Sequence, residues 1–268
     1  MNTLKGKQVL LTGGSHGLGP FIAEALAREG ANVALAARSE KDLDLTASRV
    51  KSLGAQSLAI PADLENTTER KRLVELVLER FGVVDVLINN AGLDAMGSYL
   101  KLPWQTVRQV VEVNLIAPME LTYLVLPHMI KRKQGHVVNI SSVAGKRGAP
   151  YGATYSASKA GLAEWTRGLR LELADSGVHF TTIFPGYVIR AGMFAKTGLS
   201  PSWLIGSCTP EGVARAVVRG MLRNRLEIIV NSQPLQPILN LGEQFPEFGD
   251  WMMKKIGAVD LQRRMAKE

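Results

Sequence analysis

The sequence predicts an α/β protein of the doubly wound class, a single domain built on a mostly parallel sheet of seven strands. Over the first 230 residues, short β-like runs alternate with helical patterns, without a repeat or a linker between them. Several of these runs are continuously apolar, which is typical of parallel strands covered on both faces. Strand–helix alternation over a chain of 268 residues indicates a doubly wound sheet.

The elements follow in order along the chain. Helix starts are readable at Ser39, at Asn66 (which precedes Glu69 at capping-box spacing) and at Thr209, which precedes Pro210. The expected strands are Gln8–Thr12, Asn32–Ala37, Ser57–Pro61, Val84–Asn89, His136–Ser141, His179–Phe184 and Glu227–Val230.

Composition favours a soluble globular protein, because 46% of residues are hydrophobic, 21% are charged and mean hydropathy is +0.05. The most apolar window, residues 111–130, carries Glu112, Asn114, Glu120 and two prolines, so we do not expect it to span a membrane. The first seven residues are too polar for a signal peptide, and Cys208 is the only cysteine. These features predict a cytoplasmic protein.

The net charge of +8 is concentrated in the middle of the chain. Its densest run, residues 131–133, ends an expected helix, where cations complement the helix dipole. Because no basic cluster is interleaved with aromatic residues, we expect an anionic small molecule rather than nucleic acid as the partner. We expect no metal site, because the histidines lack ligand spacing: His16, His128, His136 and His179.

A glycine-rich turn, Thr-Gly-Gly-Ser-His-Gly-Leu-Gly at residues 12–19, follows the first expected strand. Glycines allow a tight turn and bring backbone N–H groups against a pyrophosphate at a helix N-terminus. The strand before and the helix after favour dinucleotide binding over a purely structural turn. The candidate cofactor contacts here are Gly13, Ser15, His16, Gly17, Leu18 and Gly19.

The second expected strand ends in Ala37 and is followed by Arg38. A carboxylate at this place would hydrogen-bond the ribose of NAD, whereas an arginine suits the 2′-phosphate of NADP. His16 could add a further contact. The alternative is that Arg38 is a solvated residue heading the next helix. The sequence favours NADP(H) over NAD.

Tyr155 and Lys159 lie one helical turn apart in an expected helix. A fixed ammonium would stabilise the phenolate, and lowering the tyrosine pKa by ~3 corresponds to about 4 kcal/mol. Tyr155 would then act as a general acid or base near neutral pH. Taken alone, such a pair is common on helix surfaces.

Other motifs accompany this pair: Asn-Asn-Ala-Gly at residues 89–92, Asn114, and the serines Ser141 and Ser142 after the fifth strand. Together with the glycine turn, they make residues 5–230 similar to the short-chain dehydrogenase/reductase family, which has a Rossmann-type fold. The motifs occur in the family's order, and spacing matches Ser142 to its active-site serine. We therefore expect a family domain over residues 1–230 and a helical extension over 231–268.

The resemblance implies catalytic roles for four residues. Tyr155 would give its proton to a carbonyl oxygen as hydride arrives, and Lys159 would hold the nicotinamide ribose and lower the tyrosine pKa. Ser142 would hydrogen-bond the substrate oxygen, and Asn114 would hold a water in a proton relay. Preorganised donors of this kind stabilise the charge that develops on the oxygen.

The resemblance also implies cofactor contacts and a homodimer or homotetramer. Arg190 stands where the family commonly has a threonine that contacts the nicotinamide carboxamide. It would reach a phosphate, contact an acidic substrate or face solvent. The implied cofactor residues, besides the glycine turn, Arg38, Tyr155 and Lys159, are Asp63, Asn89, Ala91, Gly92, Pro185, Gly186 and Val188.

The segment of about residues 186–208 corresponds to the family's substrate loop and is rich in large apolar residues and glycines. It predicts a mobile lid over a hydrophobic ketone or alcohol, with Leu93 and Met96 adding to the wall. The alternative is that these side chains pack on the protein itself.

The extension carries an apolar stripe broken by Pro246. We expect it to pack on the protein or on a partner subunit. A second interpretation is an interfacial membrane helix with Trp251, Lys254 and Lys255 at the headgroups. The stripe consists of Leu241, Phe245, Phe248, Met252, Ile256 and Val259.

The sequence thus predicts an NADPH-dependent carbonyl reductase that acts on a hydrophobic substrate, with Tyr155 as general acid and base. One alternative is a 3-ketoacyl thioester reductase, in which Arg190 or the basic mid-chain residues bind a phosphate-bearing carrier. Another is a non-catalytic NADPH-binding regulator. Mere binding would not require Asn114, Ser142, Tyr155 and Lys159 together.

Overall fold

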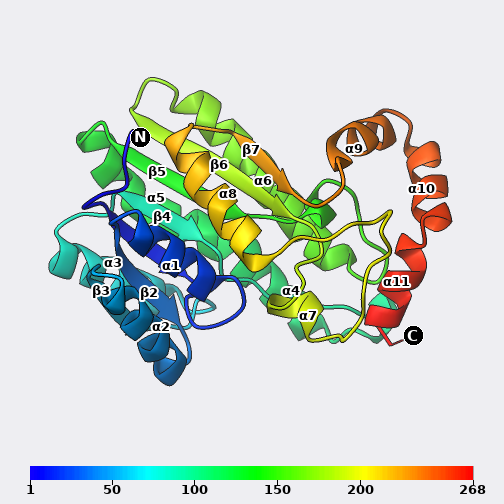
Figure 1. Cartoon of the computed structure of the whole chain (residues 1–268), viewed down its shortest axis with the longest axis horizontal. Coiled ribbons are helices and arrows are strands. Elements are labelled where there is room, and N and C mark those ends of the chain that lie inside the picture. The colour runs from blue at the N-terminus through cyan, green and yellow to red at the C-terminus, as the bar shows by residue number, and fades with distance from the viewer. Residues whose placement is uncertain (268) are drawn as a thin grey trace.

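The computed structural model describes residues 1–267, and within them the chain forms one parallel sheet in the order β3-β2-β1-β4-β5-β6-β7 (Figure 1). The doubly wound Rossmann-type fold predicted from the sequence is confirmed. The strands are β1 Gln8–Thr12, β2 Asn32–Ala37, β3 Ser57–Pro61, β4 Val86–Asn89, β5 Gly135–Ile140, β6 Val178–Pro185 and β7 Glu227–Val230.

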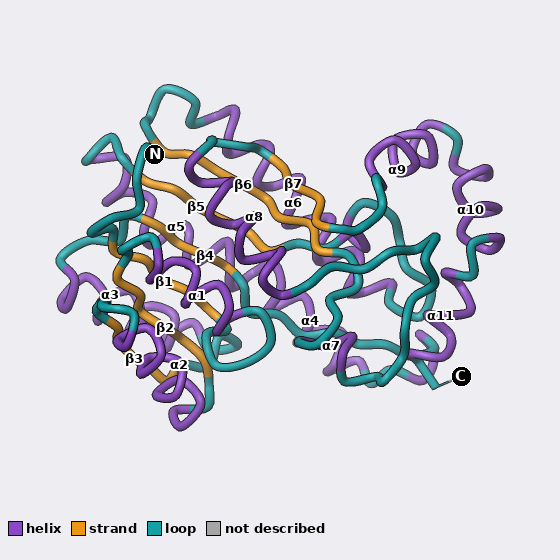
Figure 2. The backbone as a smooth tube through the Cα atoms, in the orientation of Figure 1, coloured by secondary structure: helices purple, strands orange, loops and turns teal. Residues whose placement is uncertain are grey.

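Helices cover both faces of this sheet (Figure 2). Neighbouring residues of β1 point to opposite faces: Leu11 packs in the core under α1, α2 and α8, and Leu10 in the core under α3 and α5. The helices are α1 Gly19–Arg28, α2 Glu40–Ser52, α3 Thr67–Phe81, α4 Trp104–Val111, α5 Ala117–Lys131, α6 Ala153–Glu172, α7 Gly192–Ala195, α8 Pro210–Leu222, α9 Leu235–Gln244, α10 Pro246–Lys255 and α11 Ala258–Met265.

The helix starts follow the expectation only in part. Thr209 caps α8 by accepting a hydrogen bond from the Gly212 N–H at 3.1 Å. Asn66 caps α3, but Glu69 does not close the expected capping box, because its carboxylate accepts from the Asp63 N–H at 2.8 Å instead. The Ser39 hydroxyl contacts a carboxylate of α2 rather than a backbone N–H.

A continuous helical stretch, Trp104–Lys131, joins α4 and α5 through a π-helical turn at Glu112–Ile116. By length and composition alone it could cross a membrane. In the fold, Leu121 and Val125 are buried in the core between α5 and the sheet. The buried Arg70 guanidinium of α3 lies 2.8 Å from the Glu112 carboxylate and fixes the π-helical turn. The buried face of this stretch therefore belongs to the core of the domain, and 44% of its most apolar window is buried.

Residues 235–265 form three short helices beyond the sheet, and we call this segment the cap. Pro246 does not simply interrupt one helix but begins α10. Leu261 of α11 is buried against Phe194 and Ile205 of the lid segment, residues 186–208, as expected if the tail packs on the protein. On the outer side, Phe245, Phe248 and Trp251 are exposed.

Candidate active site

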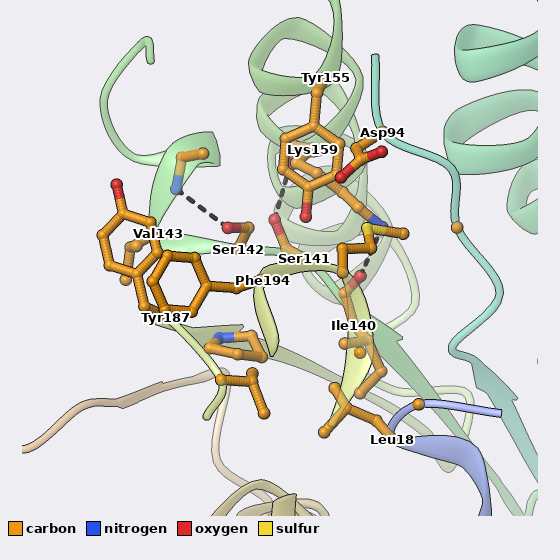
Figure 3. Close-up of a pocket in the computed structure, with 18 of the residues that line it drawn as sticks. Leu18, Asp94, Ile140, Ser141, Ser142, Val143, Tyr155, Lys159, Tyr187 and Phe194 are labelled. Atoms are coloured by element: carbon orange, nitrogen blue, oxygen red, sulfur yellow. Dashed lines mark hydrogen bonds between the residues drawn. The ribbon is translucent and has the colours of Figure 1, made fainter. Parts of the chain in front are cut away.

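The carboxyl ends of the strands open into one continuous cavity of about 660 Å³, which extends from the glycine turn to the cap. Figure 3 shows the part of its wall around Tyr155, Ser142 and Phe194. Most of the predicted site residues meet on its wall, but Gly19, Asn89 and Asn114 do not. Those that line it are Gly13, Ser15, His16, Gly17, Leu18, Arg38, Asp63, Ala91, Gly92, Ser142, Tyr155, Lys159, Pro185, Gly186 and Val188.

The glycine turn has little space for side chains. Gly13 and Gly17 adopt positive φ angles of 67° and 63°, a conformation that glycine adopts without steric cost. A Cβ atom on Gly19 would lie 2.0 Å from the Gly13 carbonyl oxygen. Gly19, which we expected to contact the cofactor, thus allows the turn to close on itself instead.

Asn90, which the sequence analysis did not single out, holds this turn in place. Its amide donates to the Thr12 and Gly13 carbonyl oxygens at 3.0 and 3.1 Å, and its backbone N–H donates to the Thr12 hydroxyl. Asn89 does not line the cleft as predicted, because it is buried and its amide donates to Asn139 at 2.8 Å. Because Asn89 and Asn90 are adjacent and of the same residue type, the sequence alone does not show which of them holds the glycine turn.

The end of β2 offers an exposed guanidinium. Arg38 lines the cavity and forms no ion pair within residues 1–267. Beside it, the His16 ring bonds the Ser15 hydroxyl at 2.9 Å and lies 3.2 Å from the Asp42 carboxylate. A tight glycine turn, a helix N-terminus and an unpaired arginine fit a phosphate-bearing dinucleotide.

Lys159 is buried at 4% exposure, and its ammonium donates to the Ile140 carbonyl oxygen at 2.9 Å. The Lys159 carbonyl oxygen in turn accepts from the Ser141 hydroxyl at 2.8 Å. The Lys159 ammonium lies 5.8 Å from the centre of the Tyr155 ring, one turn earlier on α6. Figure 3 shows Tyr155 and Ser142 facing the same part of the cavity.

The electrostatics of this pair differ from the prediction. Burial raises the pKa of Tyr155 to about 12; a hydrogen bond with Ser142 lowers this pKa and the charge of Asp94 raises it. Burial also lowers the pKa of Lys159 to about 8. The predicted lowering of the tyrosine pKa is therefore wrong for the protein alone, because burial removes the phenol from water and disfavours the charged phenolate. Tyr155 is protonated at neutral pH.

Asn114 lies behind the cavity wall rather than on it. Its Oδ1 accepts from the Leu93 N–H, and its Nδ2 donates to the Leu93 carbonyl oxygen, both at 2.8 Å. The same Nδ2 donates to the Ser158 hydroxyl at 3.0 Å. Asn114 therefore fixes the backbone of the segment that follows β4, which makes it a positioning residue, and its proposed water relay stays a prediction.

Two charged residues near the cavity behave differently. Asp94, which the sequence analysis missed, lines the cavity near Tyr155, and burial raises the pKa of its carboxyl group. Arg190 lies outside the cavity wall, and its guanidinium pairs with Glu211 at the start of α8 at 2.6 Å. In this structure Arg190 thus pairs with an acidic residue of the protein and does not face the cavity.

The wall of the cavity remote from the glycine turn comes from the segment after β4, the lid and the cap. Leu93, Met96 and lid residues such as Phe194 line it, as predicted. The cap also lines it, with Leu239, Met253 and other side chains. No group of three His, Cys, Asp or Glu residues in the described part of the chain could hold a metal ion.

Comparisons with known proteins agree with this geometry. The family model of the short-chain dehydrogenases matches residues 7–200. Ketoacyl reductase HetN of Nostoc sp. (strain PCC 7120) is 42% identical, over 100% of this chain and 95% of that protein. The chain belongs to the short-chain dehydrogenase/reductase family.

Solved structures are also similar. A variant of actinorhodin polyketide ketoreductase, crystallised with NADPH, is 32% identical with a TM-score of 0.78, over 86% of this chain and 98% of that chain. A metagenomic short-chain oxidoreductase in complex with NADP is 29% identical with a TM-score of 0.73, over 85% and 97%.

Proposed function

We propose that this protein is an NADPH-dependent ketoreductase that reduces a 3-ketoacyl group to the 3-hydroxyacyl group. The observation that carries the proposal is the placement of two hydroxyl groups, those of Tyr155 and Ser142, on the same part of the cavity wall, beside the buried Lys159. The names of HetN and of the actinorhodin ketoreductase support the ketoacyl class over a general carbonyl reductase.

The protein's own groups supply a proton and two hydrogen bonds. Ser142 donates to the ketone oxygen, and Tyr155, protonated at neutral pH, transfers its proton as negative charge develops there. The Lys159 ammonium stabilises the phenolate that remains. Bound NADPH would supply the hydride, held by the glycine turn, Lys159 and, at its 2′-phosphate, Arg38.

Activity is the first test. We expect purified protein to oxidise NADPH with the N-acetylcysteamine thioester of 3-oxobutanoate, because this probe has the ketone and thioester without the carrier. Tyr155→Phe removes the proton donor and should lower kcat/KM by about 1,000-fold, while NADPH still binds. If NADPH binds but the wild-type protein reduces no 3-ketoacyl thioester, the regulator alternative gains over the enzyme.

Cofactor choice tests the role of Arg38. Arg38→Asp replaces a phosphate partner with a carboxylate, so the Kd of NADPH should rise about 30-fold or more while NADH binds at least as well. Arg49→Asp, the same charge change on an exposed residue of α2 outside the cavity, is the control. Titration of nicotinamide fluorescence measures both. Equal losses for the two cofactors would contradict the proposal.

The pH dependence follows from the two shifted groups. Lys159, with a pKa of about 8, carries its charge below pH 8 and loses it above, whereas Tyr155 stays protonated to about pH 12. We therefore expect kcat/KM for NADPH, which reports the free enzyme, to be flat from pH 6 to about 8 and to fall about tenfold per pH unit beyond. A profile that stays flat to pH 10 would show that the charge of Lys159 is not required.

We further propose that the outer side of the cap rests on a membrane surface, because Phe245, Phe248 and Trp251 are exposed next to Lys254 and Lys255. The protein should co-sediment with vesicles of phosphatidylcholine and phosphatidylglycerol. The double substitution Phe245→Ser, Phe248→Ser should abolish this, and Tyr123→Ser, at an exposed position of α5, should not. Wild-type protein that stays in the supernatant would contradict the membrane proposal. The alternative is then a cytoplasmic homodimer or homotetramer, whose size light scattering would measure.

A further inference from the structure

The cap contributes an apolar chamber to the cavity at the end remote from the nucleotide site. Its inward side chains are aliphatic or thioether groups: Leu235, Ile238, Leu239, Met252, Met253 and Ile256. Among the described cap residues, Gln262 is the one polar side chain on the wall, and its amide donates to the Tyr187 hydroxyl at 3.2 Å. The described cap residues on the wall are thus apolar apart from Gln262.

The shape of this chamber is adaptable rather than fixed. Five of the nine methionines in the chain line the cavity: Met96, Met193, Met252, Met253 and Met265. The aromatic residues of the cap, in contrast, are exposed on its outside. Unbranched thioether side chains adjust to irregular and variable contours, whereas aromatic walls define a rigid slot. This lining suits a flexible chain better than a rigid ring system.

Arg147 links the cap to the loop that follows β5 and carries Ser142. It lies five residues after Ser142, and its guanidinium donates to the Gly242 and Pro246 carbonyl oxygens, both at 2.9 Å, and pairs with Asp250. Gly249 packs directly on it, since a Cβ atom there would lie 2.6 Å from the Arg147 Cζ. These contacts of Arg147 therefore fix the distance between the chamber and the hydroxyl groups of Ser142 and Tyr155.

We propose that the cap forms a distal subsite for the unbranched aliphatic chain of the substrate, so that medium- and long-chain 3-ketoacyl thioesters are preferred over short ones. The proposal rests on the proposed ketoreductase function for its choice of substrate. The ketone binds between Ser142 and Tyr155, and the chain extends past Phe194 into the chamber. Each buried methylene adds about 0.8 kcal/mol of transfer free energy, or about fourfold in affinity.

The test is a chain-length series of 3-oxoacyl N-acetylcysteamine thioesters from four to twelve carbons. For the wild type, kcat/KM should rise about 100-fold or more along the series. Leu239→Trp fills the chamber and should remove most of this rise. Leu241→Trp, the same substitution on α9 but at an exposed position that does not line the cavity, should leave the series unchanged.

Binding without turnover gives a second measurement. The saturated dodecanoyl thioester, which has no ketone to reduce, should bind the full-length protein in calorimetry about 100-fold more tightly than the butanoyl thioester. Leu239→Trp should weaken it and Leu241→Trp should not. If the long thioester binds more tightly as expected but the protein reduces no ketone, the proposed function is overturned and the subsite is not. Ketone reduction with equal kcat/KM and equal binding at every chain length would overturn the subsite alone.

Discussion

The burial of the Lys159 ammonium constrains the whole active site. An ammonium at 4% exposure must find hydrogen-bond acceptors, and the Ile140 carbonyl oxygen at the end of β5 supplies one. The Ser141 hydroxyl bonds the lysine carbonyl oxygen from the same strand end, so two bonds fasten α6 to β5. Gly145 allows α6 to pack closely on the loop after β5, since a Cβ atom there would lie 2.8 Å from the backbone of Lys159. This attachment brings Tyr155 opposite Ser142.

The fold was predictable because the sheet is buried on both faces, which leaves continuous apolar runs in the sequence. Strand identities were right, and the boundaries moved by one or two residues, as at β4, which begins at Val86 rather than Val84. The residues of the candidate site were harder to predict from the sequence. Asn89 and Asn90 are adjacent and identical, yet alternation at the strand end sends one into the core and the other onto the glycine turn. Sequence order cannot distinguish the two.

Other features depend on packing that no local pattern encodes. The spacing of Tyr155 and Lys159 shows that they share a helix face, but the sign of the tyrosine pKa shift depends on how many atoms surround the phenol. The apolar stripe of the tail was visible, but Pro246 begins a new helix, α10, in which Met252 lines the cavity and Phe248 is exposed. Arg147 gave no signal, because two of its partners are backbone carbonyl groups around the end of α9 and the third, Asp250, is distant in the sequence.

Several cationic residues in the middle of the chain form ion pairs within the protein. Lys146 and Arg167 both pair with Glu227 on β7, Arg147 pairs with the cap, and Arg190 pairs with α8. These cations hold peripheral segments to the sheet instead of presenting a surface to an anionic partner. Arg38 differs, since it lines the cavity and has no ion pair within residues 1–267. The cavity is thus cationic where a nucleotide phosphate would bind and apolar under the cap. This polarity would orient the proposed substrate, because only one direction keeps its apolar chain away from charge and its ketone beside Tyr155.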